Sequence, residues 1–404
     1  MPKPPPFARS AAQPLLLLIA LLLAISSTAQ PPSQLLTATV SSTHQSTALH
    51  ITSISPSAFK NIRVDWSLQT NGTITKKGTT SIPLITPNHY TLVPIPLRLP
   101  DDTAGESFLN LRFFSTALIA EQQIMIHPYH PSLSITPGTP LQLSDSNDIA
   151  TIQSPNARIS FNRQTGWLTH YEVKGINLLN DTLQTFAPEP RLQLFSNTTS
   201  STEIIIRTEY TIPATASLLH LSYTINANGE MLITEQAEPD STQPTPTQSS
   251  PTTQPPTPTQ SSPATQPPPA DHYMPAYAMQ WTLPPDFDSI ITYGPITNPN
   301  IPTPSHRIAL EHHRLPNIDT PTAPASTTPP TPSTHSNLRW FTITGENGNG
   351  IQFIADSSLL TENTLRSAGR IQLTIDHPTP NTHISQGTYP LVYKVKPLIS
   401  SPHP

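Results

Sequence analysis

The chain has 404 residues, among them 51 prolines and no cysteine, and its formal net charge is -5. This length is sufficient for two or three hydrophobic cores, and the proline content with only 11% charged residues favours strands, turns and loops, so we expect an all-β protein. The charge balance argues against nucleic acid as a partner, and the lack of cysteine excludes disulfides, thiolate metal sites and a lipid-anchored cysteine.

The first thirty residues have the pattern of an export signal. Lys3 and Arg9 precede an unbroken apolar run from Leu15 to Ile25, and small residues follow before Gln30. This order is typical of a signal peptide, and the run is shorter than the roughly 20 residues that a membrane-spanning helix requires. We therefore expect a signal peptide over residues 1–29, a secreted or periplasmic protein, and no membrane association after cleavage.

Short alternating patterns fill the region from residue 35 to residue 127. Apolar side chains occupy every second position from Ile62 to Leu68, which is the period of a strand with one buried face. Asn71-Gly72 then predicts a tight hairpin that leads into a second strand. The alternation returns between Leu109 and Phe113. Several such strands in a region of this length predict an immunoglobulin-like β-sandwich.

A second β-rich region, residues 132–398, follows a proline cluster at residues 127–131 that indicates a stiff linker. Its strand patterns lie at residues 204–206, 219–225, 231–233, 337–354 and 370–395, and the turn at residues 226–229 joins two of them. Segments 241–270 and 318–337 are rich in Pro, Thr, Gln and Ser, so we expect them to be disordered inserts. We interpret both as long loops within one sandwich, with linkers between small domains as the alternative.

Local strings in both regions carry a family resemblance. The strings of the second region are Phe161 to Leu168, Met279-Gln280, Leu283-Pro284, Leu338 to Trp340 and Glu346 to Gly348. They resemble the C-terminal sandwich of the large β-galactosidases of glycoside hydrolase family 2. Val64 to Trp66, Asn71-Gly72 and Phe108 to Leu111 make the first region similar to the immunoglobulin-like domain that precedes it in those enzymes. For the second region, the resemblance implies a galactose-mutarotase-like β-supersandwich.

The same resemblance implies that the catalytic machinery lies elsewhere. A retaining glycosidase needs two carboxylates about 5 Å apart, and in this family both belong to a (β/α)₈ barrel placed before the sandwiches. The sequence shows no barrel pattern. Three segments that the family's last sandwich lends to the active site are also altered. Residues 180–190 lack the family's aromatic, arginine and acid-rich loop, Tyr293-Gly294-Pro295 lacks an arginine, and residues 385–389 contain no tryptophan. We therefore expect no catalytic residue and no cofactor in this chain.

Three functional interpretations remain open on these grounds. The first is a secreted, non-catalytic β-galactosidase-like module that binds carbohydrate or serves in assembly. The second is the small subunit of a split β-galactosidase, which would hydrolyse terminal β-galactosides only with a barrel-bearing partner chain. The third is a truncated gene product without function.

Three residues are candidates for contact with a saccharide. Trp281 and Tyr293 could line a cleft, because aromatic rings stack on sugars, and we group Asn298 with them. A tryptophan in an alternating strand is, however, more commonly part of the core.

Histidine and aspartate clusters suggest metal or acid chemistry, which we weigh against a plain surface role. His306, His312 and His313 form the nearest histidine group, but adjacent residues on a strand point to opposite faces, so we favour surface histidines and no metal. Asp286 and Asp288 adjoin proline or turn residues, as do residues 101 and 102, so we interpret these pairs as solvated loop acids.

Overall fold

The structure is a computed structural model that describes residues 35–42, 47–100, 105–138, 140–185, 189–239, 277–296, 307–316, 333–367, 369–377 and 390–400. These residues form strands β1 to β26 and a single turn of 3-10 helix, so the expected all-β class is confirmed. The described residues up to Pro128 form one compact unit, and those from Tyr129 onward form a second. The described chain contains no helix of the length and apolarity that crossing a membrane requires. The predicted signal peptide, residues 241–270 and residues 318–332 lie outside the described residues.

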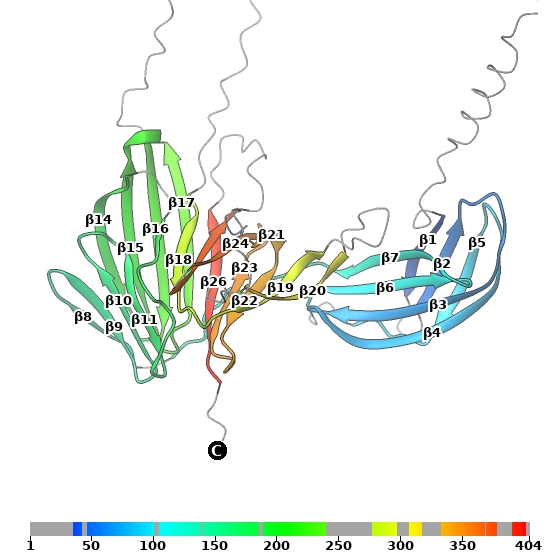
Figure 1. Cartoon of the computed structure of the whole chain (residues 1–404), viewed down its shortest axis with the longest axis horizontal. Coiled ribbons are helices and arrows are strands. Elements are labelled where there is room, and N and C mark those ends of the chain that lie inside the picture. Colours follow the sequence, from blue (N-terminus) through cyan, green and yellow to red (C-terminus); the bar gives the residue numbers. More distant parts are fainter. Residues whose placement is uncertain are drawn as a thin grey trace, which may run out of the picture. The chain divides into compact units, whose positions relative to one another are not determined.

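The first unit is a sandwich of two antiparallel sheets, drawn in blue and cyan in Figure 1. The smaller sheet contains, in spatial order, β1 (Leu36–Ser42), β2 (Thr47–Ser53) and β5 (Tyr90–Ile95). The larger sheet contains β4 (Thr73–Ile85), β3 (Phe59–Thr70), β6 (Ser107–Phe114) and β7 (Leu118–His127). Fully buried side chains from both sheets, such as Leu49, Val64 and Leu111, form one core between them. This arrangement is the expected immunoglobulin-like sandwich.

The predicted hairpin of the first unit forms as its sequence indicates. Asn71 and Gly72 have φ angles of 47° and 88°, so both adopt the left-handed conformation that a tight turn requires. Thr70 pairs with Thr73 directly across this turn. The alternation that begins at Ile62 continues through β3, with its apolar side chains in the core.

The second unit is built on a nine-stranded antiparallel sheet. In spatial order its strands are β14 (Arg191–Thr199), β15 (Glu203–Ile212), β16 (Ser217–Asn226), β17 (Met231–Pro239), β26 (Leu391–Leu398), β23 (Gly350–Ala355), β22 (Trp340–Thr344), β19 (Ser289–Ile296) and β20 (Arg307–Arg314). Such a sheet has two faces, and side chains alternate between them along each strand. Only one face joins the core described next.

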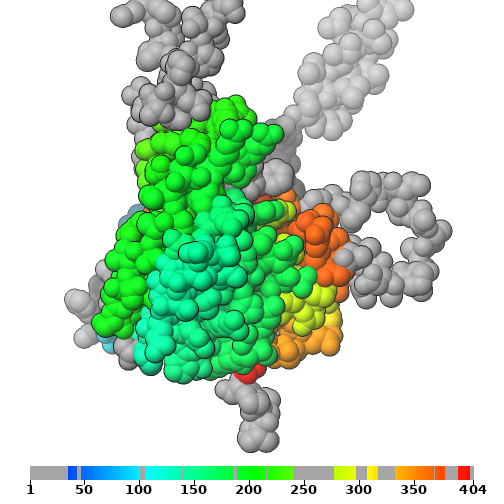
Figure 2. All heavy atoms as spheres, turned by 90° about the vertical axis from the view of Figure 1, so that its left-hand side faces the viewer, coloured from blue at the N-terminus to red at the C-terminus, as the bar shows by residue number. Residues whose placement is uncertain are grey.

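Two five-stranded sheets cover that inner face. The first, in spatial order, contains β12 (Ile176–Asn177), β11 (Leu168–Val173), β10 (Ala157–Asn162), β9 (Ile149–Gln153) and β8 (Gln142–Asp145). The second contains β13 (Gln184–Thr185), β18 (Met279–Leu283), β25 (Arg370–Asp376), β24 (Leu360–Ser367) and β21 (Ser333–Leu338). One continuous core joins all three sheets, for example through Phe161, Tyr223 and Leu373. Figure 2 shows the blue-green surface of the first covering sheet against the green strands of the large sheet.

The predicted boundary of the second insert is wrong at its C-terminal end. Ser333 to Asn337 belong to β21, where Ser333, Thr334 and His335 pair with β24. Their Ser, Thr and His composition resembles that of the preceding insert, so composition could not separate the two. Pairing with β24 supplies backbone hydrogen bonds, and His335 adds a bond to a buried carboxylate on that strand. Tertiary partners therefore order a segment whose own side chains favour a loop.

Gly294, within the Tyr293-Gly294-Pro295 string, lies where β19 passes closest to β21. A Cβ atom at Gly294 would be 2.7 Å from Leu338 Cδ2 and 3.3 Å from Leu338 Cα. Because the second contact involves backbone, we expect Gly294→Ala to destabilise the second unit by about 1–3 kcal/mol, the usual cost of overpacking a filled site. Chemical unfolding followed by tryptophan fluorescence would measure the change. An unaltered midpoint would mean that β21 moves aside without cost.

Candidate functional site

The outer face of strands β14 to β17 carries a groove formed by two neighbouring rows of side chains. Because alternate residues of these strands enter the core, the residues between them face outward. The antiparallel register aligns Ser196, Arg207, Ser222 and Thr234 in one row. It aligns Leu194, Glu209, His220 and Gln236 in the next. These eight residues line a groove of about 220 Å³, which we call the outer groove.

His220, in the outer groove, lies between two carboxylates. Its Nδ1 atom is 3.4 Å from Glu209 Oε2, and its Nε2 atom is 3.1 Å from Glu238 Oε1. Arg207 Nη1 donates a hydrogen bond of 3.1 Å to Thr198 Oγ1. Leu194 remains 51% exposed at the side of the groove and adds an apolar contact. The groove thus offers donors, acceptors and one apolar surface in a fixed arrangement.

Sequence reasoning missed this groove, because no local motif marks it. Arg207, His220 and Gln236 come from three different strands, and each alone looks like an ordinary polar residue on the solvent side of a strand. The alternation around each one did indicate an outward side chain. Only the register of the strands places the three next to one another.

The aromatic residues that the sequence suggested for saccharide contact are buried. Trp281, on β18, is 0% exposed and packs its ring edge-to-face with Phe353, with ring centroids 5.2 Å apart. Tyr293, on β19, is also 0% exposed and lies 5.6 Å from the ring of Trp340. Neither side chain offers a surface to a saccharide in this structure, since other side chains cover both rings. Asn298 lies outside the described residues.

The histidine candidates separate as strand geometry predicts. His312 is exposed, whereas His313 is partly buried on the opposite face of β20. His306 lies outside the described residues. His313 instead lies beside His335, with ring centroids 4.4 Å apart, although His335 comes from β21 and was not a candidate. A contact between strands of two different sheets has no local signal in the sequence.

The two aspartates before β19 have different environments. Asp286 is exposed, as expected for a loop acid. Asp288 differs from the expectation, because its side chain is only 13% exposed and its Oδ2 atom lies 3.1 Å from Arg314 Nε and 3.6 Å from Arg366 Nη1. The two arginines compensate for its partial burial, so Asp288 forms a structural ion pair. Residues 101 and 102 lie outside the described residues.

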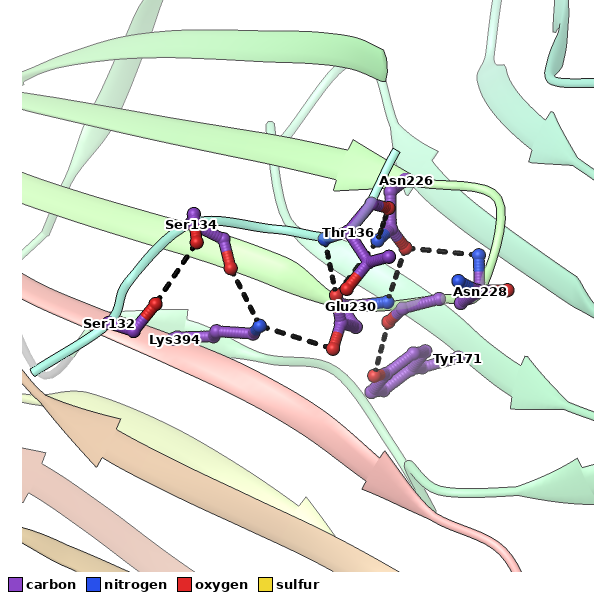
Figure 3. Close-up of polar contacts among 9 residues, drawn as sticks. Ser132, Ser134, Thr136, Tyr171, Asn226, Asn228, Glu230 and Lys394 are labelled. Atoms are coloured by element: carbon purple, nitrogen blue, oxygen red, sulfur yellow. Dashed lines mark hydrogen bonds and ion pairs between the residues drawn. The ribbon is translucent and has the colours of Figure 1, made fainter. Parts of the chain in front are cut away.

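A buried ion pair joins the start of the second unit to its large sheet (Figure 3). Lys394 Nζ is 3.1 Å from Glu230 Oε1 and donates a hydrogen bond of 2.8 Å to the Ser134 carbonyl. Glu230 Oε2 accepts hydrogen bonds from the Thr136 amide and from Asn226 Nδ2, both at 2.9 Å. Burial opposes ionisation of Glu230, but these bonds outweigh it and hold the pKa of its carboxyl below the ordinary value. Every partner belongs to the network itself, so we assign it a structural role.

A second acid, Glu235, is buried in the core of the second unit. Its side chain follows Met231 and Ile233 on the inward face of β17, and the residue is 4% exposed. Burial raises the pKa of its carboxyl well above the ordinary value, the charge of Asp376 raises it further, and a hydrogen bond from the Tyr277 backbone lowers it in part. Its Oε2 atom makes no hydrogen bond within the described part of the chain. The surroundings of Glu235 therefore disfavour its ionised form, and the residue lies away from any described groove.

Comparisons with known proteins match this chain only at the level of structure. No family model matches it, and no curated protein sequence does. One similar solved structure is YeaD from Salmonella typhimurium, whose assignment as a mutarotase is provisional. Its sequence identity to this chain is 8% and its TM-score is 0.36, and the match covers 66% of this chain and 97% of that one. HI1317 has 10% identity and a TM-score of 0.36, covering 65% and 98%. The α-galactosidase from Lactobacillus brevis has 12% identity and a TM-score of 0.27, covering 90% of this chain and 39% of that one.

Proposed function

We propose that this chain is a secreted, non-catalytic module of the β-galactosidase type that binds a saccharide in the outer groove. The observation that carries the proposal is the alignment of Arg207, Glu209, His220 and Gln236 on adjacent strands of one open face. Sugar hydroxyls both donate and accept hydrogen bonds, so they require such a mixed set of partners. The resemblance of the sequence to the C-terminal domains of glycoside hydrolase family 2 supports a galactoside as the ligand.

The carboxylates of this region favour binding over hydrolysis. A retaining glycosidase uses one protonated and one ionised carboxyl on either side of the glycosidic bond. Glu209 and Glu238 are both committed to the ring of His220, at 3.4 Å and 3.1 Å. Two acids that share one imidazole form a positioning network, and neither is placed as a nucleophile.

We expect the purified chain to bind saccharides with a terminal β-galactose, and the outer-groove variants to lose this binding. His220→Ala and Glu209→Gln should each weaken the affinity about tenfold or more, because hydrogen bonds to charged groups contribute about 1.5–3 kcal/mol. Calorimetric titration with methyl β-galactoside and lactose would measure the effect. His170→Ala is the matched control, since His170 is a partly exposed histidine that pairs with Glu172 at 3.3 Å on β11, a strand of another sheet.

Two outcomes of this experiment would overturn the proposal. The first is that His170→Ala and His220→Ala weaken the saccharide affinity equally, which would show that the saccharide does not bind in the outer groove. The second is turnover of an aryl β-galactoside by the isolated chain, lost in Glu209→Gln, which would make the module an enzyme. Turnover that appears only after a barrel-bearing chain is added would support the small-subunit interpretation instead.

A further inference from the structure

Two histidines and a glutamate meet where β20 and β21 approach each other. Glu311 and His313 are two residues apart on β20, so their side chains lie on the same face of the strand. His335 comes from β21, an edge strand of a different sheet. The potential ligand atoms of these three residues all lie within 4.8 Å of one another.

A buried carboxylate orients His335 from behind. His335 lies directly opposite Glu362 in the pairing of β21 with β24, and its Nδ1 atom donates a hydrogen bond of 2.7 Å to Glu362 Oε2. Glu362 is 0% exposed, and its other oxygen accepts a hydrogen bond from Thr364 Oγ1. This pairing fixes the proton on Nδ1 and leaves Nε2 of His335 as a free electron-pair donor. In many metal sites a carboxylate likewise accepts a hydrogen bond from one ring nitrogen of a histidine whose other ring nitrogen binds the metal.

The ring of His313 supplies a second nitrogen donor. Its Nε2 atom is buried, makes no hydrogen bond within the described residues and lies 3.6 Å from Glu311 Oε2. Two ligands of a tetrahedral zinc ion, each about 2.1 Å from the metal, are about 3.4 Å apart. The Glu311 side chain is 45% exposed, so it can rotate to close the site, and solvent can reach the remaining coordination position.

We propose that Glu311, His313 and His335 bind one divalent transition-metal ion of the zinc class, with Glu362 as the residue that positions His335. Two imidazole nitrogens and one carboxylate oxygen suit zinc, cobalt or nickel, whereas calcium and magnesium prefer oxygen ligands alone. Three protein ligands leave a fourth position for water. The ion would join β20, at the edge of the nine-stranded sheet, to β21, at the edge of a covering sheet.

The test is metal titration of the untagged, chelator-treated chain. Calorimetry with Zn²⁺ should show one ion bound per chain, and Co²⁺ at the same site should give the visible absorption of a nitrogen and oxygen ligand field. His313→Ala and His335→Ala should abolish the stoichiometric signal. Glu362→Gln should weaken Zn²⁺ binding about 10–100-fold, the usual effect of losing the residue that hydrogen-bonds to a metal-binding histidine.

His312→Ala is the matched control, because His312 lies on the same strand but on its opposite, exposed face. It should bind Zn²⁺ as the wild type does. Circular dichroism must show that each variant is folded, and Glu311→Gln, a change at a half-exposed side chain, tests the site if His335→Ala does not fold. The proposal is wrong if the wild type binds no stoichiometric Zn²⁺, or if His312→Ala weakens binding as much as His313→Ala.

Discussion

Lys394→Met is expected to destabilise the second unit by about 3–5 kcal/mol, because it leaves the buried carboxylate of Glu230 without its cation. The Lys394 and Glu230 side chains are only 8% and 9% exposed, so water cannot replace the lost partner. The loss also frees the Ser134 carbonyl that Lys394 binds, which loosens the segment leading into the sandwich. Chemical unfolding followed by tryptophan fluorescence in a Trp66→Phe background would measure this loss of stability, since the remaining tryptophans all belong to the second unit.

Lys396→Met is the control for this prediction, because Lys396 is an exposed lysine on the same strand. It should leave the unfolding midpoint nearly unchanged. The pKa of Glu230 lies below its ordinary value of 4.5, so the stability from its ionised form is complete above about 4.5 and is lost as the pH falls through the folded pKa. The difference between Lys394→Met and wild type should therefore shrink in acid. A constant difference at every pH would show that lost packing, and not the ion pair, causes the effect.

Glu235→Gln is expected to stabilise the second unit at neutral pH by about 1–3 kcal/mol, because the buried carboxyl must take up a proton on folding and the glutamine need not. The pKa of the Glu235 carboxyl is raised in the folded chain, so folding takes up a proton whenever the pH lies above the unfolded value of 4.5. Its contribution to stability is therefore complete below 4.5 and declines as the pH rises toward the folded pKa. Glutamine has nearly the same shape and cannot ionise, so the variant should not show this decline.

Measuring the free energy of unfolding of the wild type and of Glu235→Gln at pH 4 and at pH 8 would test this prediction. The variant and the wild type should have similar stability at pH 4, and the variant should be the more stable at pH 8. Glu238→Gln, at a half-exposed position on the same strand, should leave the pH profile of the unfolding free energy nearly unchanged. A loss of stability in Glu235→Gln at both pH values would mean that the carboxyl makes a favourable interaction in the core.

Much of the fold could be predicted because its signals are local. The alternation from Ile62 to Leu68 identifies β3 and its buried face, and Asn71-Gly72 identifies the hairpin that follows. The turn at residues 226–229 joins β16 and β17 as expected. In each case the backbone conformation depends on residues within one strand or one turn, so neighbouring sequence is sufficient.

The candidate sites were harder to predict because they depend on contacts between side chains of different strands. Trp281 was a candidate for stacking on a saccharide, yet it lies in the core, where its ring packs edge-to-face with Phe353. Ser333 to Asn337 resembled an insert, yet pairing with β24 makes them a strand. Composition describes what a side chain can do, and it does not describe what packs against it.

The sequence by itself determined that much of the chain forms strands, where some of them turn, and, where apolar and polar residues alternate, which side chains face the core. Only the tertiary structure decided which outward residues become neighbours. The register of β15, β16 and β17 places Arg207, His220 and Gln236 in one groove. The packing of two different sheets brings His313 to His335. Strand alternation arises from the backbone of consecutive residues, whereas register depends on the burial and hydrogen bonding of the whole sheet.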